Sequence, residues 1–240
     1  MFQTLFYNPL FNLLIFIYNN FAFQDLGLAI IFLTLFIRII FLPLFYKSAK
    51  NQILIQRLQP ELNKIQHDHK DNREKQAQAM MDLYKKHNIN PFSGFLMLLI
   101  QLPVLIAIYQ VFLHGFSPEV FGRLYSFIPK PGEFHTNLLG LLDLQKPSIL
   151  MVSLSAIAQY FQGYLALPVA DKGKTPSAAE AIAKQMVYFG PVLTIVILVN
   201  LPAAIGLYWL VTSVFSIGQQ IYINKTLNIE EEKKEHKINE

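Results

Sequence analysis

LGLAIIFLTLFIRIIFLPLF, residues 26–45, is an apolar run that contains a single charged residue, Arg38. A helix of about 20 residues covers the roughly 30 Å of hydrocarbon in a bilayer, at about 1.5 Å per residue. The run therefore predicts a membrane-spanning helix that carries an arginine past its middle. That arginine needs an explanation, because an arginine at the centre of a span costs about 2.5–3.5 kcal/mol on insertion scales.

The composition of the whole chain is that of a membrane protein. Of its 240 residues, 53% are hydrophobic and 15% are charged, whereas a soluble domain carries about 25% charged residues. The chain has no cysteine, which excludes a disulfide framework, a thiolate nucleophile and a cysteine-bound metal. A net charge of +4 alone would allow nucleic acid as a partner, but so apolar a chain is not a typical nucleic-acid-binding domain.

Five stretches are apolar enough to form membrane-spanning helices. We predict an all-α polytopic membrane protein with spans at residues 25–45, 92–114, 149–167, 185–200 and 202–223. The segment Asn200-Leu201-Pro202 separates the last two spans by a tight turn. Residues 1–24 are apolar but interrupted by asparagines and a proline. We interpret them as an amphipathic helix on the outer surface, with a sixth span as the alternative.

Lysine and arginine are distributed unequally among the loops that these spans define. Residues 46–91 carry nine of them, 168–184 carry three and the tail 224–240 carries four, whereas the loop 115–148 carries three. Lysine and arginine are retained preferentially on the cytoplasmic side of a membrane. The excess of sixteen over three therefore predicts an N-terminus outside and a C-terminus in the cytoplasm.

Residues 46–91, the basic segment between the first two spans, contain two apolar stripes at helical spacing. The stripes comprise Leu54, Leu58, Leu62 and Ile65, and then Ala77, Met80, Met81 and Tyr84. A polar break at 68–72 separates them, so we predict a cytoplasmic hairpin of two antiparallel helices. Pro60 predicts a kink in the first arm unless a helix begins close to it. A solvated linker with transient helix is the alternative.

Residues that could perform chemistry in water are few. Gly173-Lys174-Thr175 resembles the end of a phosphate-binding loop, but Pro168 stands where that motif needs a glycine. His67-Asp68-His69 and Asp71 could hold a metal loosely, but they lie at the predicted hairpin turn, where polar residues are expected anyway. We therefore predict no cofactor, no metal and no catalytic residue, and expect that the protein is not an enzyme.

Arg38 requires polar surroundings, and the predicted spans offer several polar side chains. These are Thr34, Gln101, Gln159, Gln162, Tyr208, Trp209, Thr212 and Ser213. Residues 26–45 and the other four spans contain no aspartate or glutamate, so Arg38 has no counter-ion within them. A helical side chain leans towards the N-terminus of its helix, here away from the cytoplasm, which argues against snorkelling. We predict a hydrated cavity that can accept an anion; snorkelling or a purely structural contact is the alternative.

Several stretches, in order and in register, resemble the YidC/Oxa-type membrane protein insertases. They are LTLFIRIIFLP at 33–43, Leu58-Gln59-Pro60-Glu61-Leu62, Leu83-Tyr84-Lys85 with Asn90-Pro91, Leu99-Ile100-Gln101-Leu102-Pro103, and Leu201-Pro202-Ala203 with Leu207-Tyr208-Trp209 and Gln219-Gln220. The resemblance covers about residues 5–225 and is to a short bacterial form without a large periplasmic domain. It implies five core helices around a hydrophilic groove that is open to the cytoplasm and to lipid.

The resemblance also implies roles for individual residues. Arg38 matches the family's groove arginine, Thr34 and Gln101 match groove-lining positions, and Tyr208 with Trp209 matches the aromatic pair of the last helix. To this substrate groove the polar pattern of the spans adds Gln159, Gln162 and Thr212.

The implied activity is insertion and folding of nascent membrane proteins in the bacterial plasma membrane, without ATP and with or without the Sec translocon. The Sec translocon and the ribosome are candidate partners, nucleic acid is not a specific one, and we expect a monomer in the lipid bilayer. The tail carries four lysines but five glutamates, so any ribosome contact is expected at the hairpin. The alternatives are an assembly scaffold for membrane complexes and, less favoured for lack of an inverted repeat, a small-solute transporter.

Overall fold

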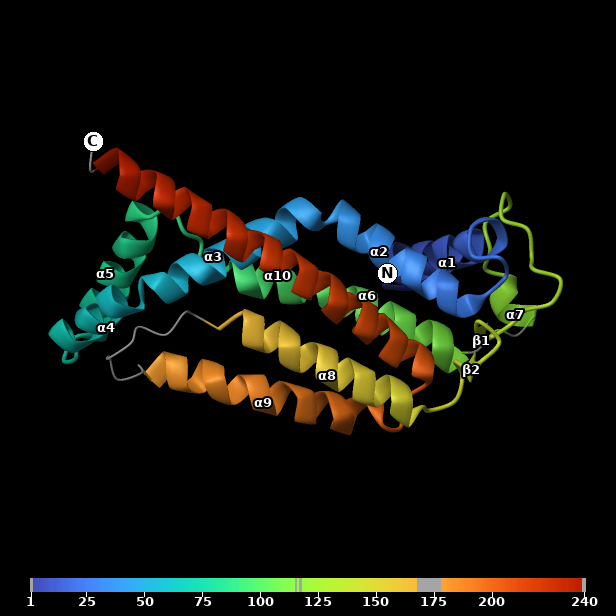
Figure 1. Cartoon of the computed structure of the whole chain (residues 1–240). Coiled ribbons are helices and arrows are strands. Elements are labelled where there is room, and N and C mark those ends of the chain that lie inside the picture. The colour runs from blue at the N-terminus through green and yellow to red at the C-terminus, as the bar shows by residue number, and fades with distance from the viewer. Residues whose placement is uncertain (1, 115, 117, 168–177, 239–240) are drawn as a thin grey trace.

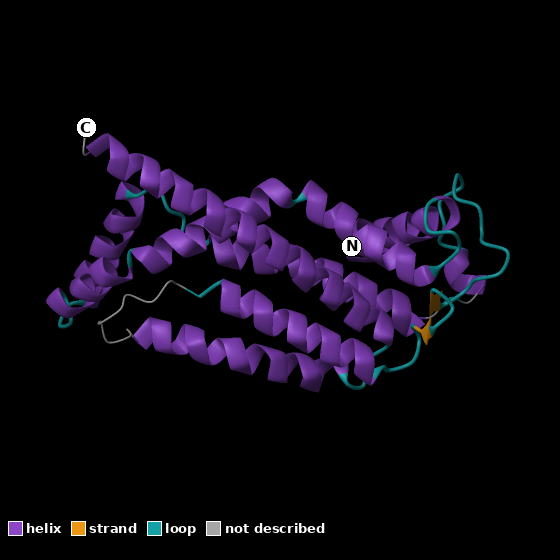
Figure 2. Cartoon of the chain, in the orientation of Figure 1, coloured by secondary structure: helices purple, strands orange, loops and turns teal. Residues whose placement is uncertain are grey.

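The chain is mostly helical in the computed structural model, which describes residues 2–114, 116, 118–167 and 178–238 (Figures 1 and 2). In chain order the described elements are the π-helical η1 (Gln3–Tyr7), α1 (Asn8–Asn20), α2 (Leu26–Ile40), α3 (Leu42–Arg57), α4 (Gln59–Asp68), α5 (Arg73–Lys86), α6 (Ser93–His114), α7 (Pro118–Phe121), β1 (Asn137–Leu138), β2 (Leu142–Asp143), α8 (Ile149–Leu165), α9 (Ala178–Leu198) and α10 (Ala203–Ile238).

The long helices form an elongated bundle (Figure 1). Helix α10 packs against α2 and α8, and α8 packs against α9. The pair α4–α5 projects from one end of the bundle, and α7 and the two short strands lie at the other. The C-terminal end of α10 lies at the same end as α5, so α10 extends from one end of the molecule to the other.

Two helices among the described residues are long and apolar enough to cross a membrane. They lie at Ser93–Leu113 in α6 and Ala203–Thr226 in α10, and the bent pair α2–α3 would make a third span. Ile149–Leu165 and Lys184–Leu198 are apolar but shorter. A short helix can cross where the bilayer thins or where neighbours bury its ends. The count of five spans therefore stays a prediction, of which the helix lengths support two or three.

The predicted first span is not one straight helix. Helix α2 ends at Ile40, and α3 starts at Leu42 after a bend of 67°. Pro43 explains the break, because a proline in a helix interior loses a hydrogen bond and clashes with the preceding turn. In the first turn of α3 its missing N–H costs nothing, since the first N–H groups of a helix have no partner within it. Helix α3 then runs on into the segment expected to form the hairpin.

The helical hairpin begins where α3 ends. A break at Leu58 places Pro60 in the first turn of α4, so the arm is divided at the proline. Leu58 and Leu62 pack against Leu83 and Tyr84 of α5 in a small apolar cluster of their own. The side chain of Asn72 caps α5 by accepting a hydrogen bond from the N–H of Lys75 at 3.0 Å.

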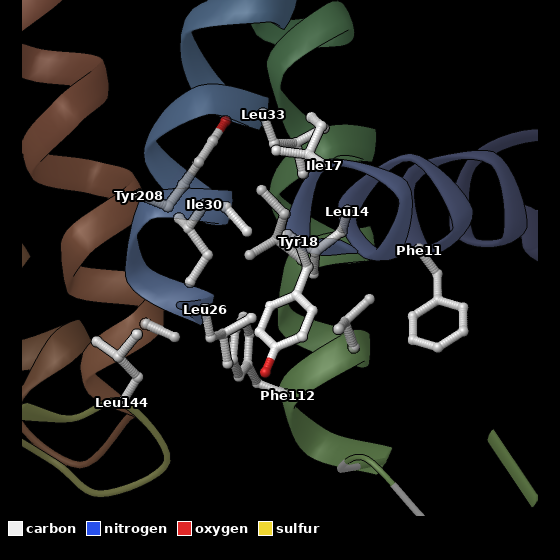
Figure 3. Packing of buried hydrophobic residues seen from close by; sticks show 14 of the residues in the cluster. Phe11, Leu14, Ile17, Tyr18, Leu26, Ile30, Leu33, Phe112, Leu144 and Tyr208 are labelled. Atoms are coloured by element: carbon white, nitrogen blue, oxygen red, sulfur yellow. The ribbon is translucent and has the colours of Figure 1, made fainter. Parts of the chain in front are cut away.

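The largest apolar core lies where α1 crosses α2 and α6 (Figure 3). Phe11, Ile15 and Tyr18 of α1 are fully buried, and they share this core with Leu26 and Ile30 of α2. An interfacial helix is expected to bury only one face. Helix α1 buries more, because the loop between α6 and α8 covers it as well: the hydroxyl of Tyr18 accepts a hydrogen bond from the N–H of His135 at 2.8 Å.

Asn12, which is 1% exposed, also holds that loop to α1. The side-chain oxygen of Asn12 accepts a hydrogen bond from the N–H of Tyr125 at 2.6 Å. Its amide nitrogen donates to the carbonyls of Asn8 at 2.8 Å and Arg123 at 3.3 Å. Further along the loop, β1 and β2 pair antiparallel, and Leu138 lies so close to Gly27 of α2 that a Cβ there would collide with it.

We predict that Asn12→Ala lowers the free energy of unfolding by about 1–3 kcal/mol, because the N–H of Tyr125 loses its acceptor and the buried Asn12 side chain loses its hydrogen bonds to the loop. Thermal unfolding of the purified protein in detergent measures the effect. Asn20→Ala is the matched control: Asn20 lies on the same helix and donates to the carbonyl of Phe16 at 2.8 Å, but it is exposed. Equal losses for the two variants would contradict a special role for Asn12.

Candidate functional site

Arg38 lies in the last turn of α2, just before the bend, and is 7% exposed. Its guanidinium carbon is 4.5 Å from the ring centre of Phe45 and 5.9 Å from that of Phe215. A cation over an aromatic face is attracted by the ring, more strongly when water is excluded. No carboxylate lies within ion-pair distance of Arg38 among the residues that the structure describes. The guanidinium faces two phenyl rings, and the hydrated cavity stays a prediction.

Tyr208 of α10 is the centre of a first polar group near Arg38. Its hydroxyl accepts a hydrogen bond from the side-chain amide of Gln101 on α6, and Thr212 follows one turn later. Figure 3 shows the Tyr208 ring reaching from α10 towards α2, with its hydroxyl near Leu33. Thr34 is on α2 and is 1% exposed, but its hydroxyl donates to the carbonyl of Ile30 in its own helix at 2.6 Å. This polar group therefore joins α6 to α10 beside α2.

Gln159 of α8 is the centre of a second polar group. Its side-chain oxygen accepts a hydrogen bond from the indole N–H of Trp209 on α10, at 2.8 Å, and another from the hydroxyl of Thr194 on α9. Gly190 allows this approach, because a Cβ there would lie 3.1 Å from the side-chain nitrogen of Gln159. Gln162 is half-buried on α8, and we find no side-chain hydrogen bond for it within the described part of the chain.

The predicted groove residues thus fall into two groups rather than one. Thr34, Arg38, Gln101, Tyr208 and Thr212 lie around α2, α6 and α10, and Gln159 and Trp209 lie where α8, α9 and α10 meet. Gln162 belongs to neither. The division follows from helix geometry, since consecutive residues such as Tyr208 and Trp209 point about 100° apart at 3.6 residues per turn.

The sequence analysis did not identify three residues that contact members of these groups. Phe45 and Phe215 cover Arg38, but nothing in the sequence places their rings there, because the contact depends on the bend after α2. Thr194 did have a signal. It is the single polar side chain in the apolar run 189–199, it is 1% exposed, and it bonds to Gln159.

Metal or nucleotide chemistry gains no support from the geometry. The described residues contain no group of three or more histidines and carboxylates that could hold a metal ion. His67 and Asp68 form only an exposed pair at 3.7 Å. The segment Gly173-Lys174-Thr175 lies outside the described residues.

Known proteins with similar sequences are membrane proteins. The model of the family described as "60Kd inner membrane protein" matches residues 16–232. The membrane protein insertase YidC of Clostridium tetani is 36% identical over 201 residues, which are 83% of this chain and 81% of the relative. YidC of Wolinella succinogenes is 34% identical over 227 residues, which are 94% of this chain.

The relatives differ in length from this chain. It spans 38% of the Wolinella relative and 35% of YidC from Pelobacter propionicus, to which it is 32% identical over 206 residues. Among solved structures, an active YidC insertase with its first transmembrane domain resolved matches with a TM-score of 0.56 at 24% identity. That match covers 90% of this chain and 45% of the other, and it shows a shared fold. On the family model and the Clostridium relative, the chain belongs to the 60Kd inner membrane protein family, the YidC/Oxa-type family that its sequence resembles.

Proposed function

We propose that this chain inserts nascent membrane proteins into the bilayer and helps them to fold, using the polar surroundings of Arg38 to admit a polar client segment. The observation that carries the proposal is a buried guanidinium in an apolar bundle, with aromatic rings and no carboxylate beside it among the described residues. Relatives that are at least 30% identical are named membrane protein insertases, which supports the same activity.

Arg38 contributes because a client can replace its contacts with the two aromatic rings. Its attraction to the rings of Phe45 and Phe215 is worth about 2 kcal/mol or more when desolvated. A carboxylate forms shorter, charge-assisted and often bidentate hydrogen bonds with a guanidinium, and these are stronger. An acidic or polar client flank that displaces the rings therefore meets a cation inside the membrane, where the same flank would otherwise be poorly solvated.

The apolar part of a client leaves the protein sideways into lipid. Helix α9 exposes apolar side chains over much of its length, among them Met186, Phe189 and Val196. Removing apolar surface from water supplies about 25 cal/mol per Å². The membrane potential adds about 2.3 kcal/mol per charge per 100 mV for an acidic flank that moves outward. These two terms drive insertion without nucleotide hydrolysis.

In the proposed topology the N-terminus lies outside and the C-terminus in the cytoplasm. The spans are α2 with the start of α3, then α6, α8, α9 and α10, and the hairpin α4–α5 is cytoplasmic. The distribution of lysine and arginine supports this orientation. The hairpin receives clients and is the candidate contact for the Sec translocon and the ribosome. Helix α1 lies at the outer surface, covered by the outer loop.

The orientation can be tested with single cysteines, because the natural chain has none. We predict that a membrane-impermeant maleimide labels Gly132→Cys in intact cells and labels Lys86→Cys only after permeabilisation. Both positions are exposed, and a Cβ at Gly132 meets nothing within 4 Å. The opposite labelling pattern would invert the proposed topology.

The role of Arg38 can be tested by insertion of a single-span client with an acidic N-terminal flank into liposomes that hold only this protein. We predict that Arg38→Ala lowers the protease-protected fraction about tenfold or more and that Arg38→Lys retains most of it, because the cation acts by attraction. Loss of an interaction with a buried charge of about 1.5–3 kcal/mol corresponds to that factor. A client with a neutral flank should depend less on Arg38.

Arg123→Ala is the matched control, since Arg123 also lies over an aromatic ring, 5.7 Å from the centre of Tyr7, but in the outer loop. It should insert clients as the natural protein does. Equal insertion by Arg38→Ala and the natural protein would remove Arg38 from the mechanism. If the natural protein gave no protection above empty liposomes, the insertase proposal would fail and an assembly scaffold would be favoured.

A further inference from the structure

A cleft of about 700 Å³ lies between α3 and α10, beyond the bend that ends α2. Leu42, Pro43 and Tyr46 line it from α3, and Phe215, Gly218 and Tyr222 are among the residues that line it from α10. Its volume falls within the about 300–1,000 Å³ of sites that hold small ligands. The lining is mostly apolar, and it is separate from the hydrogen-bonded groups around Tyr208 and Gln159.

The backbone creates this cleft. The 67° bend redirects α3, which packs less extensively against α10 than α2 does. On the facing side of α10, Gly218 has no side chain, and a Cβ built there would meet nothing within 4 Å. A hollow that results from a bend and a missing side chain does not close by small side-chain movements, so an apolar occupant is needed to fill it.

The polar features near the cleft gather towards one of its ends. Helices α3 and α10 both run towards the end of the molecule that carries α4 and α5 (Figure 1). Tyr46 and Tyr222 lie on these helices with their ring centres 6.2 Å apart. Lys47 follows Pro43 by one turn, Lys225 follows Tyr222 by one turn, and both lysines are exposed. Residues 42–57 and 203–226 contain no aspartate or glutamate, and the glutamates of α10 begin five residues after Lys225, at Glu230. The parts of α3 and α10 that border the cleft therefore carry positive charge only.

We propose that the cleft binds one anionic phospholipid from the surrounding bilayer, with an acyl chain between α3 and α10 and the phosphate beside Lys47 and Lys225. Tyrosine favours the boundary between hydrocarbon and headgroups, and lysine near the membrane surface attracts anionic lipid. From the cleft outward, apolar residues are followed by the tyrosine pair and then by the lysines. This order matches the acyl chain, the interfacial region and the charged headgroup of one phospholipid. An apolar client helix or a second copy of this chain would use the cleft but not the lysines.

The site has a consequence for Arg38, through Phe215. One ring lines the cleft and also lies 5.9 Å from the guanidinium carbon of Arg38. An acyl chain in the cleft packs against this ring and favours its position over Arg38. The bound lipid thereby stabilises the covered state of the arginine. Lipid binding itself rests on the proposed membrane topology but not on insertase activity.

The test is native mass spectrometry of the full chain in detergent, with added phosphatidylglycerol or phosphatidylcholine. We expect one bound phosphatidylglycerol, held about tenfold or more tightly than phosphatidylcholine, because each lysine near an anionic headgroup contributes about fivefold. Gly218→Leu, which fills the cleft and favours the helix, should weaken binding of both lipids about tenfold. Lys47→Gln with Lys225→Gln should abolish the preference for phosphatidylglycerol and leave phosphatidylcholine binding unchanged.

Two controls separate the cleft from general effects. Gly132→Leu adds the same side chain at another open glycine, in the outer loop, and Lys75→Gln with Lys86→Gln removes the same charge from the hairpin. Both should bind lipid as the natural protein does. The proposal is overturned if Gly218→Leu binds lipid normally, if the natural protein shows no preference for phosphatidylglycerol, or if a dimer forms that Gly218→Leu disrupts. Because the experiment measures lipid binding alone, a failed insertion assay would not contradict the lipid-binding proposal.

Discussion

Burial of one guanidinium is the constraint on which this structure depends. Arg38 lies in an apolar helix, and a buried cation needs electron-rich neighbours to offset the loss of its hydration. Here the bend after α2 supplies Phe45 from the same chain segment, and α10 supplies Phe215. The same bend opens the cleft between α3 and α10. One region of the molecule therefore contains the buried charge, the bend between α2 and α3, and the cleft beside that bend.

Helix α10 connects the parts of the bundle. Its early residues face several helices in turn: the carbonyl of Gly206 accepts a hydrogen bond from Ser155 of α8 at 2.9 Å, Tyr208 bonds to α6, and Trp209 bonds to Gln159. About one turn further, Ser213 is buried, and beyond it the helix borders the cleft. Because each residue of a helix points in its own direction, one long helix can take part in two separate polar groups and also line the cleft.

The sequence predicts the helical class and the family correctly, because length, hydropathy and charge are properties that each segment carries by itself. The apolar stripes that include Leu58, Leu62 and Tyr84 predict the paired helices α4 and α5 for the same reason. The role of Arg38 stays a prediction. What the sequence misses depends on contacts between segments. The rings over Arg38 follow from a bend whose angle no local pattern specifies, and the division of Gln101 and Gln159 into two groups follows from how five helices are rotated about their axes. Helix α3 contains residues of both the predicted first span and the predicted hairpin, because it continues across the boundary between them.

Asn12 has a further consequence for the order in which the protein assembles during its own synthesis. Its hydrogen bonds join α1 to Arg123 and Tyr125, more than a hundred residues later in the chain. Contacts between distant segments form late, because the intervening chain must be made and closed first. The partners of Asn12 therefore become available to α1 only once the chain has been synthesised past Tyr125, although α1 itself has long been complete.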